Sequence, residues 1–230
     1  YAFPSGLLET VVQVLRSNEI PFDLRDLRVK PERERLGTRW NSKITLRDYQ
    51  EEAVAAVESQ TRGLLKLPPR AGKTLIAAAL IHRLQVGAAF LVNSQILLRQ
   101  TQTALEWALG IPIGIIGDGE CSPRRVTVAT VQSLTRTLYP SKDAKGDFRA
   151  DEEQIGLYRR LLASPLIVFD EAHHLTAEVW RKLVLESASY YKVGLSATIY
   201  LNQAGADPDT VWLMATTGPV LFERTIQELV

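Results

Sequence analysis

The chain has 230 residues, 46% of them hydrophobic, and a formal net charge of +1, which suits one large α/β domain with a small appendage or two small domains. Its single cysteine, Cys121, excludes an internal disulfide, and three histidines nearly exclude a Cys/His zinc site, so any metal must bind oxygen ligands. No apolar run is long enough to span a membrane and no signal-peptide pattern is present, so we expect a cytoplasmic or nucleoid-associated protein that is not secreted.

The N-terminal region predicts a small α/β appendage. GLLETVVQVLRSN (6–18) has helical spacing, and IPFDLRDLRV (20–29) favours a strand or a short β pair. Between residues 25 and 47, eight basic residues stand against three acidic ones. This charge predicts either a surface that attracts a phosphate backbone or a solvated linker. We therefore expect an appendage with a basic linker over 1–40 and the main domain over 41–230.

Apolar spacing in LRDYQEEAVAAV (46–57) predicts a helix, and Thr45 with Asp48 suggests a capping box at its start. From residue 63 onward, apolar β-type runs alternate with helical patterns, which predicts an α/β fold with a parallel sheet covered by helices on both faces. The polar segments 140–154 and 202–209 predict surface loops. The expected strands are GLLKL, AAFLV, PIGII, VTVAT, LIVFD and YKVGLS, and the expected helices cover about 73–86, 95–109, 131–138 and 176–187.

LPPRAGKT (67–74) lies between an apolar strand and a helix and reads as a phosphate-binding loop. We expect its backbone N–H groups, including those of Ala71 and Gly72, to hold phosphates, Lys73 to neutralise charge, and the Thr74 hydroxyl to bind Mg²⁺. Two glycines of the usual pattern are replaced, by Leu67 and Arg70. The Arg70 side chain either points away from the phosphate, which we favour, or reaches over it as an extra cation.

LIVFDEAHH (166–174) places two carboxylates at the end of a buried strand, at the edge where open α/β sheets bind ligands. Asp170 is suited to hold Mg²⁺ opposite Thr74, and Glu171 to orient and deprotonate an attacking water. Carboxylates that merely cap the following helix would explain one of the two, but not both. Lys73, Asp170 and Glu171 are therefore the candidate catalytic residues, with ATP and Mg²⁺ as ligands.

Taken in order, these motifs resemble the superfamily 2 helicases and translocases, which are nucleic-acid-dependent ATPases built on RecA-like domains. LRDYQ (46–50) resembles their adenine-recognising Q motif, and GLSAT (194–198) resembles their motif III. LVNSQILLRQ (91–100) and VTVATVQSL (126–134) resemble motifs that contact nucleic acid. The form of LRDYQ, the phosphate loop and the ending GPVLFERTIQELV look most like the branch of the xeroderma pigmentosum group B and phage recombination helicases.

The resemblance implies further roles, residue by residue. Gln50 would read the adenine edge with Arg47 packing beside the base, and His173 would link the ATP site to Ser196 and Thr198, which couple hydrolysis to movement. The small polar residues of the two nucleic-acid motifs would approach the phosphate backbone without reading bases. These residues are Asn93, Ser94, Gln100, Thr130, Gln132 and Ser133, and Asn93 replaces the family's usual proline.

Such motors close ATP between two RecA-like domains, and we expect this chain to hold only the first, as a fragment or a split protein. It would bind ATP or ADP weakly, hydrolyse slowly at best and not unwind alone, because the second domain supplies arginine fingers. DNA is the expected partner, with RNA not excluded. Three alternatives remain: a non-motor DNA-binding or regulatory module, favoured by Pro69 and Arg70; a translocase subunit of a restriction system; and a P-loop kinase or small-molecule ATPase, disfavoured by the nucleic-acid motifs.

Overall fold

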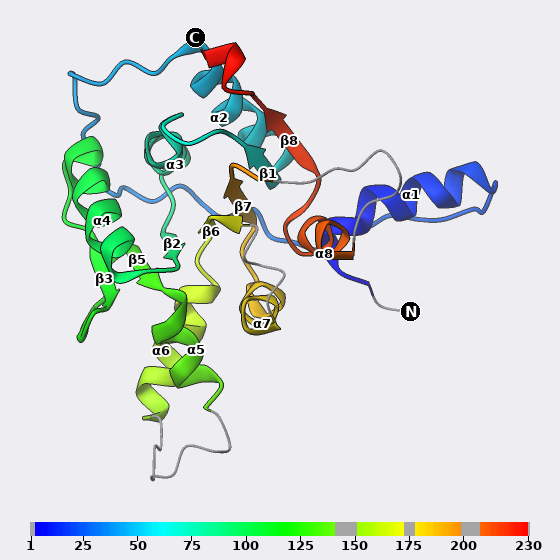
Figure 1. Ribbon diagram of the computed structural model, residues 1–230. Coiled ribbons are helices and arrows are strands. Elements are labelled where there is room, and N and C mark those ends of the chain that lie inside the picture. Colours follow the sequence, from blue (N-terminus) through cyan, green and yellow to red (C-terminus); the bar gives the residue numbers. More distant parts are fainter. Residues whose placement is uncertain (1–2, 141–150, 173–177, 199–207, 230) are drawn as a thin grey trace.

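A computed structural model describes residues 3–140, 151–172, 178–198 and 208–229. The centre of the molecule is an eight-stranded sheet with the order β4-β3-β5-β2-β6-β7-β1-β8 (Figure 1). All neighbouring strands run parallel except β4, which pairs antiparallel with β3. The strands are β1 (Arg62–Lys66), β2 (Ala88–Val92), β3 (Gly114–Gly117), β4 (Glu120–Ser122), β5 (Val126–Thr130), β6 (Leu166–Asp170), β7 (Tyr191–Ser196) and β8 (Val220–Glu223).

The central strands are apolar at consecutive positions because both faces of the sheet are covered. In β1, Leu65 belongs to one hydrophobic core and its neighbour Leu64 to the other, and Phe90 and Leu91 of β2 divide in the same way. The first core contains α2 (Asp48–Gln60), α3 (Lys73–Leu84) and α4 (Gln95–Leu109). The second contains α5 (Val131–Leu138), α6 (Glu152–Leu162), α7 (Glu178–Glu186) and α8 (Pro208–Thr217). The predicted α/β fold with two helical layers is confirmed.

Three local predictions were wrong. The capping box of α2 is not formed by Thr45: the helix begins at Asp48, and the N–H of Arg47 donates to Oε1 of Gln50 at 2.9 Å. Helices α6 and α8 were not predicted, and they begin at Glu152 and Pro208, within the last residues of the segments predicted as loops. The remainder of those predicted loops, 141–150 and 202–207, lies outside the described residues. The short strand β4 was not predicted at all. In contrast, α4 and α5 have the predicted bounds, and α3 ends two residues early at Leu84.

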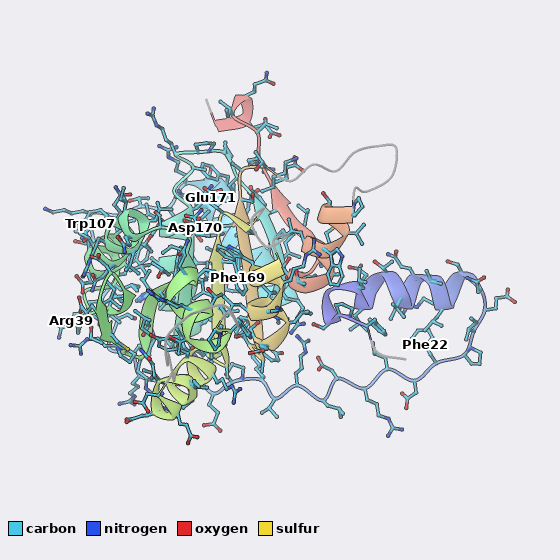
Figure 2. The ribbon with its side chains drawn as sticks, turned by 60° about the horizontal axis from the view of Figure 1, so that its bottom comes forward. Phe22, Arg39, Trp107, Phe169, Asp170 and Glu171 are labelled. Atoms are coloured by element: carbon cyan, nitrogen blue, oxygen red, sulfur yellow. The ribbon has the colours of Figure 1, made fainter. Side chains whose placement is uncertain are left out.

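The N-terminal arm contains the short 3-10 helix η1 (Ser5–Leu7) and the predicted helix, α1 (Leu8–Ser17), but the strand predicted over 20–29 is wrong. This segment has no regular structure, and Leu27 and Val29 are each 87% exposed. A β-type sequence needs a neighbouring strand to complete its hydrogen bonds, and 20–29 has none among the described residues. Figure 2 shows Phe22 on this arm, apart from the main body of the molecule.

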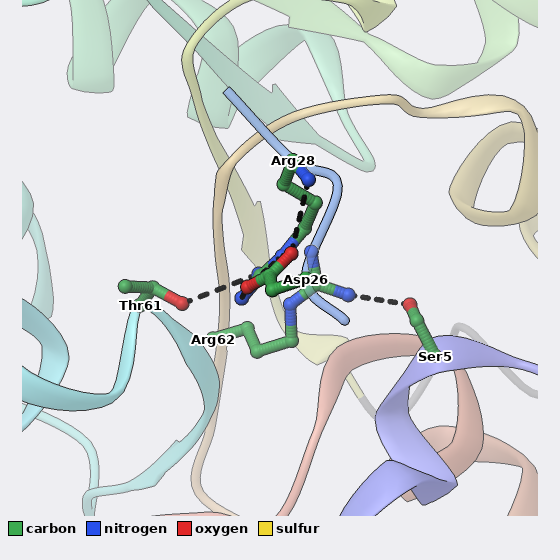
Figure 3. Close-up of polar contacts among 5 residues, drawn as sticks. All are labelled: Ser5, Asp26, Arg28, Thr61 and Arg62. Carbon is green, nitrogen blue, oxygen red and sulfur yellow. Dashed lines mark hydrogen bonds and ion pairs between the residues drawn. The ribbon is translucent and has the colours of Figure 1, made fainter. Parts of the chain in front are cut away.

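The arm is fastened to the domain by polar contacts near the start of β1 (Figure 3). The guanidinium of Arg28 donates to Asp26, at 2.7 Å for the shortest contact, and to the Thr61 hydroxyl at 3.4 Å. That of Arg62 donates to the Ser5 hydroxyl. The Arg28 hydrogen bonds hold the pKa of Asp26 at about 2, well below its usual value. Part of the basic region is therefore paired within the chain.

The segment 33–44, which joins the predicted appendage and basic linker (1–40) to the predicted main domain (41–230), follows the domain surface at the end of α3 and of α4. The N–H of Glu34 donates to the Gln85 carbonyl at 2.5 Å, and that of Arg39 donates to the Leu109 carbonyl at 2.7 Å. The remaining element is the 3-10 helix η3 (Gln227–Leu229). Within the described residues, no helix is long and apolar enough to cross a membrane.

Candidate functional site

Three neighbouring strands, β1, β7 and β6, end at one edge of the sheet and bring the predicted nucleotide motifs together. The loop 67–72 follows β1, Ser196 ends β7, and Asp170 ends β6. The backbone joins two of these motifs, because the N–H of Leu67 donates to the Ser196 carbonyl at 2.9 Å. The carboxyl ends of parallel strands are where ligands bind in such sheets.

The loop itself has the backbone of an anion-binding turn. Arg70 and Gly72 have φ angles of 65° and 76°, in the left-handed region that favours glycine. Gly72 is required for a second reason, because a Cβ atom there would lie 2.5 Å from Nε2 of Gln50. Helix α3 begins directly at Lys73, and the first N–H groups of a helix have no partner within it and carry its positive dipole. The Arg70 side chain is exposed at the loop crest, as the favoured interpretation requires.

Helix α2 holds this loop through two side chains in its first turn. The Tyr49 hydroxyl donates to the Ala71 carbonyl at 3.0 Å, and Nε2 of Gln50 donates to the same oxygen at 2.9 Å. Oε1 of Gln50 accepts the N–H of Arg47. A side-chain amide has two N–H hydrogens and two oxygen lone pairs, so the buried Gln50 keeps one donor and one acceptor beyond these two hydrogen bonds.

Lys73 and the two carboxylates lie close together, as the motifs predicted. Nζ of Lys73 is 3.3 Å from Oε1 of Glu171, and Figure 2 shows Asp170 and Glu171 side by side at the end of β6. Burial raises the pKa of Asp170, the charge of Glu171 raises it further, and Lys73 partly opposes both. Glu171 has a left-handed φ of 51°, an uncommon conformation for a residue with a side chain and one that often marks functional sites.

The donor set is suited to a magnesium–nucleotide complex. Mg²⁺ prefers hard oxygen ligands and is commonly held by one or two protein groups together with substrate phosphates. Thr74 in the first turn of α3 offers a hydroxyl, and Asp170 offers a carboxylate whose raised pKa a dication would lower; both residues are half-buried. The described residues contain no cluster of three or more His, Cys, Asp or Glu side chains that could hold a metal without a substrate.

The proposed coupling residues are only partly described. The Ser196 hydroxyl donates to the Thr198 carbonyl at 3.1 Å and accepts the N–H of Thr198 at 3.2 Å, which closes a tight turn after β7. His173 lies outside the described residues, so its predicted link to this turn stays a prediction. Ser196 is fully buried, directly beside the phosphate loop that its carbonyl contacts.

The predicted nucleic-acid residues gather in a groove at the same sheet edge, beyond the ends of β2, β3 and β5. Two of them also cap helices: Ser94 accepts the N–H of Leu97 at 3.2 Å, and Thr130 accepts that of Ser133 at 3.3 Å. Gln100 is exposed on α4 and does not line the groove. The groove has a volume of about 540 Å³ and is lined by Asn93, Ser94, Gln95, Ile96, Asp118, Gly119, Thr130, Gln132, Ser133 and Arg136.

Among the residues that sequence reasoning missed at these sites, Tyr49 and Arg136 bear most on ligand binding. Tyr49 has the apolar spacing that predicted the helix over 46–57, and no role at the nucleotide site was expected of it, yet its hydroxyl reaches the phosphate loop. Arg136 adds a cation to the groove and could have been found from its position, three residues after Ser133 on the same helix face.

Comparison with known proteins gives consistent matches. Residues 43–201 match the family model described as "Type III restriction enzyme, res subunit". "DNA 3'-5' translocase XPB2" of Sulfurisphaera tokodaii is 31% identical over 187 residues, which are 81% of this chain and 37% of that protein. "DNA 3'-5' helicase XPB" of Mycobacterium tuberculosis is 31% identical over 191 residues, 80% of this chain and 31% of that protein. The chain thus spans about a third of the length of these relatives.

Solved structures agree on the fold. The crystal structure of T4 UvsW aligns with a TM-score of 0.66 at 20% identity, covering 97% of this chain and 46% of that one. The Hef helicase domain of Pyrococcus furiosus aligns with a TM-score of 0.54 at 21% identity, covering 77% of this chain and 38% of that one. The RecA-like fold and the resemblance to xeroderma pigmentosum group B-type helicases, both predicted from the motifs, are confirmed.

Proposed function

The chain belongs to the family of the type III restriction enzyme res subunit, and from this premise we propose that it is the first motor domain of an ATP-dependent DNA helicase or translocase. The observation that carries the proposal is the approach of Lys73 to Glu171 at 3.3 Å, beside the half-buried Asp170, at the sheet edge that also holds the groove. The relatives named above, a DNA translocase and a DNA helicase, support DNA as the partner; RNA is the less favoured substrate.

The geometry suggests a separate role in ATP binding and hydrolysis for each residue of the site. Lys73 exchanges its contact with Glu171 for the negative charge of the ATP phosphates, and the loop N–H groups hold the same phosphates. Release from Lys73 leaves Glu171 as the base that orients and deprotonates the attacking water. Mg²⁺, held by Thr74 and Asp170 when bound, would neutralise charge that develops on the transferred phosphoryl group. Gln50 and Arg47 are the proposed contacts to adenine.

Movement on DNA requires more than this chain. We propose residues 41–230 as the first RecA-like domain and 1–40 as an appendage, with a second motor domain, in cis or in trans, that completes the ATP site. An arginine finger raises the rate of phosphoryl transfer by roughly 10³ to 10⁵ in comparable enzymes. The 230 residues alone should therefore bind nucleotide, hydrolyse it slowly and not unwind DNA. Ser196, Thr198 and His173 are the proposed coupling residues.

Two other functions are supported by particular observations. The family description favours a translocase subunit of a restriction system, which would use the same residues on the same substrate. The strained, glycine-replacing Arg70 favours a non-motor DNA-binding module that keeps nucleotide only as a structural ligand. The motor reading accounts for more of the site, because a structural ligand does not need Glu171 beside Lys73.

The deciding experiment is Lys73→Ala in the protein that carries both motor domains. A motor loses ATP hydrolysis and translocation, whereas a module with a structural nucleotide keeps its DNA binding and regulatory effect. Lys66→Ala is the matched control, since Lys66 ends the preceding strand and pairs with Glu223 at 2.6 Å. Unchanged translocation in Lys73→Ala would refute the proposed motor.

The groove has its own test. Arg136→Gln should weaken DNA binding for all sequences alike and reduce the slope of log affinity against log salt by about one unit. Arg160→Gln is the control, because Arg160 lies at the opposite edge of the sheet, near the starts of β2 and β6. Equal effects of the two variants would show that the groove is not the DNA site.

A further inference from the structure

The contact of Tyr49 with the phosphate loop has no role in the function proposed so far. Its hydroxyl donates to the Ala71 carbonyl at 3.0 Å and is within 3.5 Å of Nη1 of Arg47. With Gln50 as second donor, both lone pairs of the Ala71 carbonyl oxygen are engaged. A carbonyl at this position in the loop would repel a phosphate if it turned inward.

The direction of this carbonyl fixes the direction of a donor. The peptide between Ala71 and Gly72 is trans, so the N–H of Gly72 points opposite to the Ala71 oxygen. Holding that oxygen against α2 therefore turns the Gly72 N–H away from α2. Backbone N–H groups of this loop are what an anion would contact, so a flipped peptide removes a donor and introduces an acceptor.

This loop has particular need of such a restraint. Leu67 anchors its start, because it is fully buried, and Ala71 is 1% exposed. Between them Arg70 occupies a left-handed conformation, with φ 65°, which costs about 1 to 2 kcal/mol relative to ordinary backbone. A strained loop that relaxes would lose the peptide orientation, and the only contacts from α2 that oppose this among the described hydrogen bonds are those of Tyr49 and Gln50.

We propose that Tyr49 is a positioning residue for phosphate binding: its hydroxyl keeps the Ala71 carbonyl out of the phosphate cradle independently of base recognition by Gln50. The proposal rests on the proposed ATP site. Gln50 is divided between the loop and the base, whereas the single hydroxyl hydrogen of Tyr49 is donated to the loop, and Arg47 contacts only the oxygen, at 3.5 Å. Substitutions of the two neighbours should thus have different effects on ligand binding. Loss of the Tyr49 hydroxyl should weaken the binding of any ligand that carries the phosphates, and loss of the Gln50 amide should change the preference for one base over another.

The test compares Tyr49→Phe with Gln50→Ala, using the 230-residue chain and three probes: ATP, GTP and inorganic triphosphate. Tyr49→Phe should weaken the binding of all three probes by one common factor, roughly 2- to 12-fold, which is the range expected for one neutral hydrogen bond. Gln50→Ala should in addition reduce the preference for ATP over GTP. Equal affinities of Tyr49→Phe and the parent chain, or a loss confined to ATP, would overturn the proposal.

A second measurement needs no ligand. Amide hydrogen exchange over residues 68–75 in the nucleotide-free chain should be faster in Tyr49→Phe than in the parent, because the loop peptide is less restrained. Tyr158→Phe is the matched control: it removes a hydroxyl that accepts from Gln154 at 3.1 Å on the other face of the sheet. Unchanged exchange in Tyr49→Phe would refute the positioning role, whereas failure of the parent chain to bind any probe would refute only the proposed ATP site.

Discussion

Nζ of Lys73 lies 3.3 Å from Oε1 of Glu171, so the residue proposed to hold phosphate is paired with the residue proposed to activate water. Both side chains are partly buried, 13% and 30% exposed, so the pair is screened less than a surface pair. In the proposed mechanism, the nucleotide phosphates displace Glu171 from Lys73. The nucleotide-free site therefore keeps its base neutralised, and binding of substrate releases it.

This pairing predicts a separation of binding from hydrolysis in Glu171→Gln. Removal of the base should lower ATP hydrolysis by about 10² to 10⁴ in the protein with both motor domains, while affinity for ATP stays equal or rises because Lys73 loses a competing anion. Single-turnover hydrolysis and nucleotide titration measure the two effects. Glu223→Gln, which breaks the Lys66 pair at the same sheet edge, should change neither. Hydrolysis at the parent rate in Glu171→Gln would remove this residue from the mechanism.

The carboxylate of Asp170 should lower the stability of the folded chain at neutral pH while it serves the proposed binding of Mg²⁺. Burial, then the charge of Glu171, raise the pKa of Asp170 above its usual value of 3.8, so its contribution to stability is present at low pH and is lost as pH rises through the raised pKa. At pH 7 the melting temperature of Asp170→Asn should be higher than that of the parent, by a few degrees for a change of about 1 kcal/mol in the free energy of unfolding. This difference should vanish towards pH 4.

The same Asp170→Asn variant should lose the dependence of ATP binding on Mg²⁺, because the amide no longer neutralises the ion. Asp118→Asn serves as the control, since Asp118 is an exposed carboxylate paired with Arg99 at 3.2 Å. A variant at position 170 that is less stable than the parent at pH 7 would contradict the role of burial. One that keeps full magnesium dependence would contradict the ligand assignment.

Two substitutions of Arg70 distinguish the effect of its backbone conformation on stability from the effect of its charge on ATP binding. Arg70→Gly relieves the left-handed strain at φ 65° and should stabilise the chain by up to about 1 kcal/mol, after the larger entropy loss of glycine on folding. Arg70→Ala removes the same cation but keeps the strain, so it should not stabilise. ATP affinity should change less than about twofold in both variants if the side chain points away from phosphate. A large loss of affinity in both would identify Arg70 as a phosphate ligand.

The central sheet was predictable because its strands are buried on both faces. AAFLV and VTVAT have every residue buried, which gives a sequence signal that does not depend on register. The prediction of a strand over 20–29 was wrong for the opposite reason. Its alternating residues favour β structure, but no described strand pairs with it. Helix α6 was not predicted at all, because Glu152 and Glu153 at its start belong to a polar run that also suits a loop.

The site divides in a similar way. The juxtaposition of Lys73, Thr74 and Asp170 was predictable from their motifs. Lys73 and Thr74 follow β1 through the phosphate loop, Asp170 ends β6, and the strand order brings these strand ends to one edge. The contact between Tyr49 and Ala71 joins residues 22 positions apart and depends on how α2 packs beside the loop. No local pattern encodes that placement, since Tyr49 has the spacing of an ordinary core residue.

The last prediction concerns Lys192, which lies near the start of β7, at the edge of the sheet opposite the phosphate loop. It is 5% exposed, and Nζ donates to the carbonyls of Val184 and Ser187 at 2.9 and 3.1 Å, at the end of α7. Burial, helped by the charge of Arg62, lowers its pKa from 10.5 to about 7. Above pH 7 the unfolded chain therefore binds a proton that the folded chain does not.

Stability should accordingly rise with pH between about 7 and 10.5, and this rise belongs to Lys192. For one proton the slope approaches about 1.4 kcal/mol per pH unit. Urea unfolding of the parent and of Lys192→Met at pH 7, 8 and 9 measures it, and the variant should lose the slope even if its stability is lower overall, because two helix carbonyls lose their donor. Lys182→Met, a change on the neighbouring helix, should keep the slope. A slope of equal size in Lys192→Met would show that this amine is charged in the folded chain.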